Sequence, residues 1–310
     1  MALIDIRGLR KRFRDQEAIQ GIDLSIEAGE IFGLIGPDGA GKSTLIRLLA
    51  GILPPTTGEI FLHDIDVVTN YEEARKIIGY MPQTFGLYGP LTVAENLRAV
   101  ARIRGVTGAE FQKRTERLYR FSGLAPFQDR RAAQLSGGMK QKLGLCCVLI
   151  HQPSILLLDE PTVGVDPISR REFWDILHTL AAQGSTILIS TPYLEEAARC
   201  HRIAFLRQGK ILEVLDPLTL RERFPYATCD IFAPEPRVLL QGLQGRLTPT
   251  AAFLSGDHVH LIGEKQLLAS GRLEKTVRQL VAKGAIVEVK ETTPTVQDLY
   301  FVQERMGNET

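Results

Sequence analysis

A glycine-rich segment near the N-terminus has the residue types that bind nucleotide phosphates. It fits the phosphate-loop pattern and reads Gly36, Pro37, Asp38, Gly39, Ala40, Gly41, Lys42, Ser43, with Thr44 next. Glycines let backbone N–H groups approach the phosphates, and Lys42 adds a positive charge near the β- and γ-phosphates. The hydroxyl of Ser43 can hold Mg²⁺. The segment therefore predicts a site for ATP with Mg²⁺.

The flanking sequence supports this interpretation over a glycine turn that matches by chance. The apolar run 31–35 precedes the loop and predicts a buried strand. After the loop, apolar residues recur at helical spacing until Gly51, at positions Leu45, Ile46, Leu48 and Leu49. A strand, a glycine loop and a helix in this order are the setting that the motif requires.

Two adjacent carboxylates follow another apolar run, residues 155–158. Asp159 suits Mg²⁺ coordination, because phosphate-loop ATPases place an acid at a strand end facing the loop. Glu160 is then the candidate that polarises the attacking water. The competing interpretation is that both acids cap the turn before Pro161. The presence of the phosphate loop in the same chain favours the catalytic interpretation over this one.

Composition places these motifs in a folded chain with two cores. The 310 residues suit one large domain and a smaller one, with 44% hydrophobic and 24% charged residues. The net charge of +1 gives no electrostatic reason to expect nucleic acid as a partner. The longest apolar run, 143–150, is too short for a membrane span of about 20 residues. The N-terminus reads as a strand rather than a secretory signal, so we expect a cytoplasmic protein.

The order of apolar runs predicts an α/β fold with a mostly parallel sheet. Residues 155–158 and 186–189 are short and fully apolar, as in central parallel strands. Residues 88–135 carry charged helical stretches and predict an inserted helical subdomain. Composition changes at 225–236, which predicts a nucleotide-binding domain over 1–225 and a small α/β accessory domain over 230–310. In that second unit an apolar stripe predicts one helix face, formed by Leu273, Val277, Leu280 and Val281.

A further segment, Leu135-Ser136-Gly137-Gly138-Met139, resembles the signature of ATP-binding cassette proteins. A serine and two glycines at a helix start also make a physically sound anion site. The resemblance implies that Ser136, Gly137 and Gly138 bind the γ-phosphate of ATP held by an opposite cassette. Met139 departs from the family, which most often has glutamine there. Alone, this segment would be an ordinary helix cap.

The same resemblance assigns roles to isolated residues. Gln83 matches the loop that senses Mg²⁺ and water and adjoins the transmembrane partner, and Asp166 matches a loop that crosses the dimer interface. Phe13 stands where an aromatic ring stacks on adenine, although a core position for Phe13 is an equal alternative. The family's switch histidine should stand at 192, but this residue is Pro192, which has neither an imidazole nor an N–H.

The resemblance is close over about residues 3–225 and weaker beyond. Residues 291–300 resemble the terminal segment of drug-resistance and ABC-2 type export ATPases. Segments 36–39 and 166–171 resemble the first cassette of the tandem YbhF group. These features imply an ATP-hydrolysing subunit peripheral to the cytoplasmic face of the membrane. Its implied partners are a second cassette, in a homodimer, heterodimer or tandem, and separate permease subunits.

Two alternatives remain open at this point. A soluble cassette acting on ribosomes or DNA would carry two cassettes with a charged linker, or a long coiled-coil insertion, and this sequence has neither. A non-hydrolysing regulatory cassette in a heterodimer or tandem is supported by Pro192.

Overall fold

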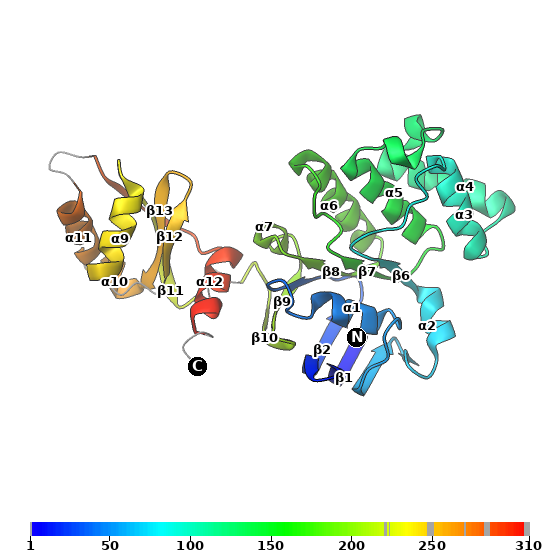
Figure 1. The fold of residues 1–310 in the computed structure, drawn as a ribbon, viewed down its shortest axis with the longest axis horizontal. Coiled ribbons are helices and arrows are strands. Elements are labelled where there is room, and N and C mark those ends of the chain that lie inside the picture. Colours follow the sequence, from blue (N-terminus) through cyan, green and yellow to red (C-terminus); the bar gives the residue numbers. More distant parts are fainter. Residues whose placement is uncertain are drawn as a thin grey trace. The chain divides into compact units, whose positions relative to one another are not determined.

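The computed structural model describes residues 2–219, 222, 224–246, 251–269, 271–281 and 286–306. The chain divides into two compact units, Met1–Val214 and Leu215–Thr310 (Figure 1). This division falls earlier than the change in composition at residue 225. The segment between the last strand of the first unit and Tyr226 is grouped with the second unit.

A six-stranded sheet forms the centre of the first unit, in the order β10, β9, β3, β8, β7, β6. The strands are β3 (Ile31–Ile35), β6 (Ile78–Met81), β7 (Ile155–Asp159), β8 (Thr186–Thr191), β9 (Arg202–Arg207) and β10 (Lys210–Leu215). From β6 to β9 the neighbours pair in parallel. Every residue of β3, β7 and β8 is buried, as in parallel strands covered on both faces. The predicted α/β fold with a mostly parallel sheet is confirmed.

Different elements cover the two faces of this sheet (Figure 1). Helix α1 (Lys42–Leu49) and an antiparallel sheet lie on one face. Helices α5 (Gly137–Leu149) and α6 (Pro167–Ala182) lie on the other. Because the strands are parallel, the carboxyl ends of β3, β7 and β8 meet at one edge, and the loops that follow them meet there too.

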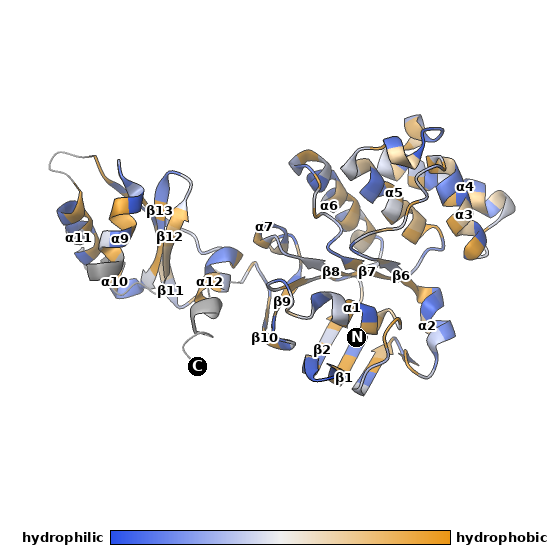
Figure 2. Ribbon diagram, in the orientation of Figure 1, coloured by the Kyte–Doolittle hydropathy of each residue, from blue (hydrophilic) through white to orange (hydrophobic). Residues whose placement is uncertain are grey.

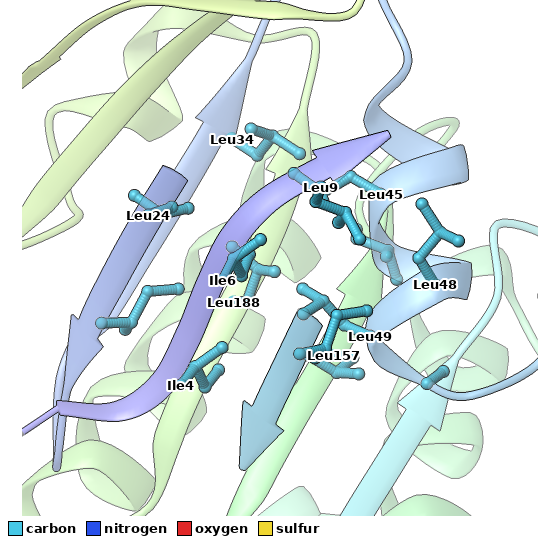
Figure 3. Close-up of a cluster of buried hydrophobic side chains, with 14 of the residues drawn as sticks. Ile4, Ile6, Leu9, Leu24, Leu34, Leu45, Leu48, Leu49, Leu157 and Leu188 are labelled. Atoms are coloured by element: carbon cyan, nitrogen blue, oxygen red, sulfur yellow. The ribbon is translucent and has the colours of Figure 1, made fainter. Parts of the chain in front are cut away.

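The antiparallel sheet has the order β2, β1, β4, β5. It comprises β1 (Ala2–Phe13), β2 (Gln16–Glu27), β4 (Thr57–Leu62) and β5 (Ile65–Asp66), and is followed by α2 (Tyr71–Ile77). Its apolar side chains pack against α1 and the central sheet (Figure 3), and the cluster includes Ile4, Ile6, Leu9, Leu45, Leu48, Leu49, Leu157 and Leu188. Burying each such side chain stabilises the fold by about 1.5–3 kcal/mol. This core holds α1, and thus the phosphate loop, against the sheet.

A helical insertion separates β6 from β7. It contains α3 (Val93–Ile103), α4 (Gly108–Ser122), η1 (Ala125–Phe127) and η2 (Ala132–Gln134). Helix α3 begins with a capping box in which Thr92 and Glu95 bond to each other's backbone N–H, and α4 ends at Gly123 in the left-handed conformation. Bands of hydrophobic and hydrophilic residues alternate on these helices (Figure 2), and their apolar sides pack on α5.

No helix in the described part of the chain combines the length and apolar sequence needed to cross a bilayer.

The second unit is an antiparallel sheet with helices, in the strand order β12, β13, β11, β14. Its elements are β11 (Tyr226–Phe232), α9 (Pro236–Arg246), β12 (Ala251–Ser255), β13 (His258–Glu264), α10 (Lys265–Ala269), α11 (Arg272–Leu280), β14 (Glu288–Thr292) and α12 (Val296–Met306). Leu273 and Val277 of the predicted stripe are buried in its core, and Leu280 packs against that core. Val281 was predicted on the same helix face, but its backbone is extended, so the helix ends one residue earlier.

Candidate functional site

The glycine-rich loop connects β3 to α1 at the carboxyl edge of the central sheet. A Cβ atom on Gly36 would lie 2.1 Å from the carbonyl oxygen of Leu206. Gly41 has φ +109°, and a Cβ there would lie 2.8 Å from Ala18 O. Only glycine fits these two positions, which is the physical reason for two of the glycines in the motif. The loop thereby presents its backbone to whatever occupies the space above it.

Lys42 is a buried cation at the base of this loop, with 4% exposure. Its Nζ donates to Gly36 O at 2.8 Å and to Pro37 O at 3.2 Å. Nζ also lies 3.4 Å from Glu160 Oε1. The loop carbonyls and this carboxylate hold the ammonium group in place at the base of the loop.

Asp159 ends β7 and is fully buried. Its Oδ1 accepts hydrogen bonds from Ser43 Oγ at 2.9 Å and from Ser190 Oγ at 2.8 Å. Its Oδ2 is buried and has no hydrogen-bond partner among the residues that the structure describes. A free carboxylate oxygen beside a serine hydroxyl is the ligand chemistry that Mg²⁺ prefers. Asp159 and Ser43 therefore fit a Mg²⁺ site.

Glu160 follows Asp159 in a left-handed backbone conformation, with φ +49°. Its N–H donates to the carbonyl oxygen and hydroxyl of Ser190, at 3.2 and 2.9 Å. Its Oε2 accepts from Gln83 Nε2 at 3.0 Å. Lys42 and Gln83 thus flank the carboxylate of Glu160, although Gln83 and Glu160 are 77 positions apart in sequence.

A cavity of about 840 Å³ lies beside the phosphate loop, a size suited to a nucleotide. Its lining includes Lys42, Gln83 and Glu160. Phe13 also lines it and is 43% exposed, so Phe13 is not a core residue in this structure. The remaining predicted residues in the lining are Asp38, Gly39, Ala40, Gly41, Ser43 and Thr44. One cavity thus brings together the phosphate loop, a carboxylate and an exposed aromatic ring.

Gly36, Pro37 and Asp159 are not among the residues that line this cavity. A second group of predicted residues, at the starts of α5 and α6, also lies outside the lining. Ser136 caps α5, its Oγ accepting from Met139 N at 3.3 Å. Asp166 caps α6 by accepting from the N–H groups of Ile168 and Ser169. The hydrogen bond from the Ser169 N–H is the main cause of a lowered Asp166 pKa.

The starts of α5 and α6 lie against each other. A Cβ atom on Gly138 would be 2.3 Å from the Cβ of Ser169, and one on Gly137 would be 3.6 Å from Gly164 O. Gly138 therefore allows the close approach of the two helix starts. Together they place Ser136 and Asp166 in one region of the first unit.

The last two residues of β8, Ser190 and Thr191, carry hydroxyl groups close in sequence to Pro192. Ser190 Oγ donates to Asp159, and Thr191 Oγ1 donates to Glu196 Oε2 at 2.6 Å. Both residues are fully buried, whereas Pro192 is exposed. Neither hydroxyl is free to take the role of a histidine at position 192.

Ser190 is the part of this site that the sequence analysis did not assign. It pairs with Asp159 in the register of β7 and β8, which are neighbouring parallel strands. The sequence pattern could have predicted that Ser190 lies near Asp159. Ser190 ends an apolar run just as Asp159 does, and the carboxyl ends of parallel strands share one edge.

A parallel α/β sheet whose β3–α1 loop surrounds a buried lysine defines the phosphate-loop class of nucleotide-binding proteins. Within that class, the chain belongs to the ATP-binding proteins of ABC transporters. The sequence profile of the ABC transporter family matches residues 19–163. The Nod factor export ATP-binding protein I of Burkholderia thailandensis is 37% identical over 245 residues, which cover 78% of this chain and 81% of that protein.

A second relative is the probable multidrug ABC transporter ATP-binding protein YbhF of Escherichia coli (strain K12). It is 42% identical over 304 residues, covering 97% of this chain and 52% of the relative. The chain thus spans about half the length of this relative. Among solved structures, the ATP binding subunit of an ABC transporter has a TM-score of 0.64 and 30% identity, covering 72% of this chain and 93% of that one. The ATP-binding cassette MJ0796, a dimer bound to ADP and Pi, has a TM-score of 0.62 and 26% identity. The match covers 69% of this chain and 98% of that one.

Proposed function

We propose that this chain binds Mg-ATP in the cavity above the phosphate loop and hydrolyses it to drive a membrane exporter. The observation that carries the proposal is the free Oδ2 of Asp159 beside the hydroxyl of Ser43. Ser43 directly follows the buried Lys42, whose Nζ lies 3.4 Å from Glu160 Oε1, and both Lys42 and Glu160 line the cavity. The relatives named for multidrug transport and Nod factor export support the exporter part of the proposal.

Each residue near the cavity has a definite role in this proposal. Backbone N–H groups of the loop and the Lys42 ammonium bind the β- and γ-phosphates. Ser43 and Asp159 hold Mg²⁺, which neutralises charge on the phosphates. Glu160 accepts a proton from the attacking water, and the amide of Gln83 keeps that carboxylate oriented by its 3.0 Å hydrogen bond. Phe13 stacks on the adenine ring.

A complete site needs a second cassette in this proposal. Ser136 and Gly138 lie at the start of α5, where a helix N-terminus attracts anions. Since they are outside the lining of the cavity, they bind the γ-phosphate of ATP held by the partner cassette. Asp166 meets that partner across the interface. The partner is a second copy of this chain or a different cassette, and the dimeric MJ0796 structure supports such a pairing.

The membrane part of the exporter is a separate set of permease subunits in this proposal. The chain then lies on the cytoplasmic face of the membrane, where ATP is supplied. Gln83 and the helical insertion transmit cassette closure to the permease. A regulatory cassette that binds ATP without hydrolysing it is the second candidate, and Pro192 is the observation that favours it, because proline has no donor for the γ-phosphate.

Co-purification tests the transport assignment. The tagged full-length chain is isolated from detergent-solubilised membranes, and the polypeptides that accompany it are identified by mass spectrometry. We expect a multi-span membrane protein to be retained, together with a second cassette or a second copy of the chain. Recovery with ribosomes or DNA, and without any membrane protein, would contradict the exporter assignment.

A further inference from the structure

Glu196 is a buried carboxylate that the proposed nucleotide site does not use. It lies on the short helix α7 (Leu194–Ala197) and is 2% exposed. Its Oε1 accepts from Thr162 Oγ1 at 2.7 Å, and its Oε2 accepts from Thr191 Oγ1 at 2.6 Å. Both threonines are themselves buried. A buried carboxylate is costly unless it is hydrogen-bonded, so these two contacts explain why it is tolerated at this position.

A cation from α6 completes the surroundings of this carboxylate. Arg170 Nε lies 3.5 Å from Glu196 Oε1. The Arg170 guanidinium stacks over the ring of Tyr193 at 4.1 Å, and its Nη2 donates to Val165 O at 3.3 Å. Such a stacked guanidinium has its orientation fixed by packing. Glu196 thus links the segment after β7, the end of β8 and the first turn of α6.

Both threonines lie near Glu160, one along the chain and one on the neighbouring strand. Thr162 is two positions after Glu160 in the same loop. Thr191 directly follows Ser190, whose carbonyl oxygen and hydroxyl accept from the N–H of Glu160. Glu196 therefore contacts a residue that follows Glu160 in its own loop and a residue next to Ser190, the backbone partner of Glu160.

The hydrogen bonds from Thr162 and Thr191 to Glu196 are relevant to the backbone conformation of Glu160. Its φ of +49° lies in the left-handed region. That region costs a non-glycine residue about 1–2 kcal/mol, and it persists only where the surrounding structure holds it. The Thr162–Glu196–Thr191 hydrogen bonds supply such a restraint, and they do so from outside the lining of the nucleotide cavity.

We propose that Glu196 is a positioning residue for ATP hydrolysis, acting through Thr162 and Thr191 on the carboxylate of Glu160. The inference rests on the proposed function of the cavity. Hydrolysis needs the carboxylate within hydrogen-bond reach of the water, and a displacement of 1 Å can cost about a hundredfold in rate. ATP binding depends on the phosphate loop instead. Loosening this network therefore slows turnover without weakening ATP binding.

Two substitutions at one position test the proposal in the full chain. Thr162→Val removes the hydroxyl and keeps the shape, whereas Thr162→Ser keeps the hydroxyl. We expect Thr162→Val to lower kcat about tenfold with KM for Mg-ATP within about twofold, and Thr162→Ser to restore kcat. Thr191→Val should repeat the loss. Thr179→Val removes an exposed hydroxyl on α6 that donates to Asp175 O of the same helix, and serves as the control.

A double-mutant cycle separates positioning of Glu160 from a general loss of structure. Single-turnover hydrolysis is measured for Thr162→Val in the parent and in the Glu160→Gln chain. If Thr162 acts through Glu160, the tenfold loss disappears in the second background. An equal loss in both backgrounds would overturn the proposal, as would a raised KM with unchanged kcat. Mg-ATP binding by the parent is measured first, because a parent that binds no nucleotide contradicts the proposed function itself.

Discussion

Ser43 Oγ donates a 2.9 Å hydrogen bond to Asp159 Oδ1 across 116 positions of sequence. The bond joins the first turn of α1 to the end of β7. It brings the two oxygen groups suited to Mg²⁺ into contact, while the second oxygen of Asp159 stays available. The apolar core beneath α1 includes residues of both elements and fixes their relative position.

Replacing Lys42 with alanine should weaken Mg-ATP binding strongly. The ammonium group is buried at the phosphate loop, and a hydrogen bond to a charged group contributes about 1.5–3 kcal/mol. The dissociation constant should therefore rise about ten- to hundredfold in calorimetry. Lys76→Ala removes an exposed lysine of α2 that pairs with Glu73, and should leave affinity unchanged. Equal affinity of the Lys42→Ala chain and the parent would show that ATP binds elsewhere.

The sequence predicts the local parts of this site and leaves its long-range contacts open. The phosphate loop and the Asp159–Glu160 pair are recognisable because each follows an apolar run that forms a strand. The hydrogen bond between Gln83 and Glu160 depends on β6 lying beside β7, which no local pattern encodes. The roles assigned to Ser136 and Asp166 stay predictions, because they concern a partner cassette.

The contacts of Glu196 are a second example of long-range contacts that the sequence does not predict. The sequence motifs do not point to Glu196, and its side chain is buried. Its partners Thr162 and Thr191 come from two other segments, so only the folded structure reveals the network. The change in composition at Pro225 likewise does not coincide with the division at Val214–Leu215, because a contact boundary depends on packing rather than on composition.

Introducing a histidine at position 192 should accelerate hydrolysis. The hydroxyls of Ser190 and Thr191 are engaged with Asp159 and Glu196, so they cannot supply the missing donor. A donor that stabilises charge in the transition state contributes about a hundredfold or more to kcat. We therefore expect weak steady-state hydrolysis by the isolated parent, and stimulation by a partner cassette that carries the histidine.

The assay for position 192 compares turnover at saturating ATP for the parent, Pro192→His and Pro192→Ala. The alanine variant restores backbone freedom without adding an imidazole, so only the histidine variant should gain rate. A high ATP turnover by the parent that Pro192→His fails to raise would refute the idea of an incomplete site. It would instead indicate that the hydroxyl of Tyr193 is the γ-phosphate donor.

The stability of the second unit should depend on pH through a histidine between two carboxylates. His260 Nδ1 lies 2.6 Å from Asp230 Oδ1, and its Nε2 lies 2.8 Å from Asp298 Oδ1. Burial lowers the pKa of His260, but the two carboxylates outweigh burial and raise it above its usual value. Burial raises the pKa of Asp298, yet its contacts with His260 and Thr295 outweigh burial and lower it.

The sign of the pH effect follows from these shifts. The raised pKa of His260 contributes stability below about pH 6.5, which is lost as pH rises through the folded pKa. The lowered pKa of Asp298 contributes stability above about pH 4, which is lost as pH falls. Stability of this unit should therefore be highest between these values.

Hydrogen exchange of residues 251–264 in the full chain measures this pH dependence. Protection should fall as pH rises above about 6.5, after correction for the intrinsic exchange rate. Asp298→Asn should lower protection by about 1.5–3 kcal/mol near pH 6 and flatten the fall. His63→Asn, at an exposed position of the first unit, serves as the control. An unchanged pH profile in the Asp298→Asn chain would exclude the ion pair as its cause.

Hydrolysis by the Glu160→Gln chain tests the central claim most directly. The amide keeps the shape and the contact region of the carboxylate but cannot accept a proton, so phosphate release should fall about 10²–10⁴-fold. Mg-ATP affinity should remain that of the parent, and ATP-bound dimers should accumulate on gel filtration. Glu73→Gln, at an exposed position of α2, should behave as the parent. A Glu160→Gln chain that releases phosphate as fast as the parent would contradict the assignment of Glu160 as the hydrolytic base.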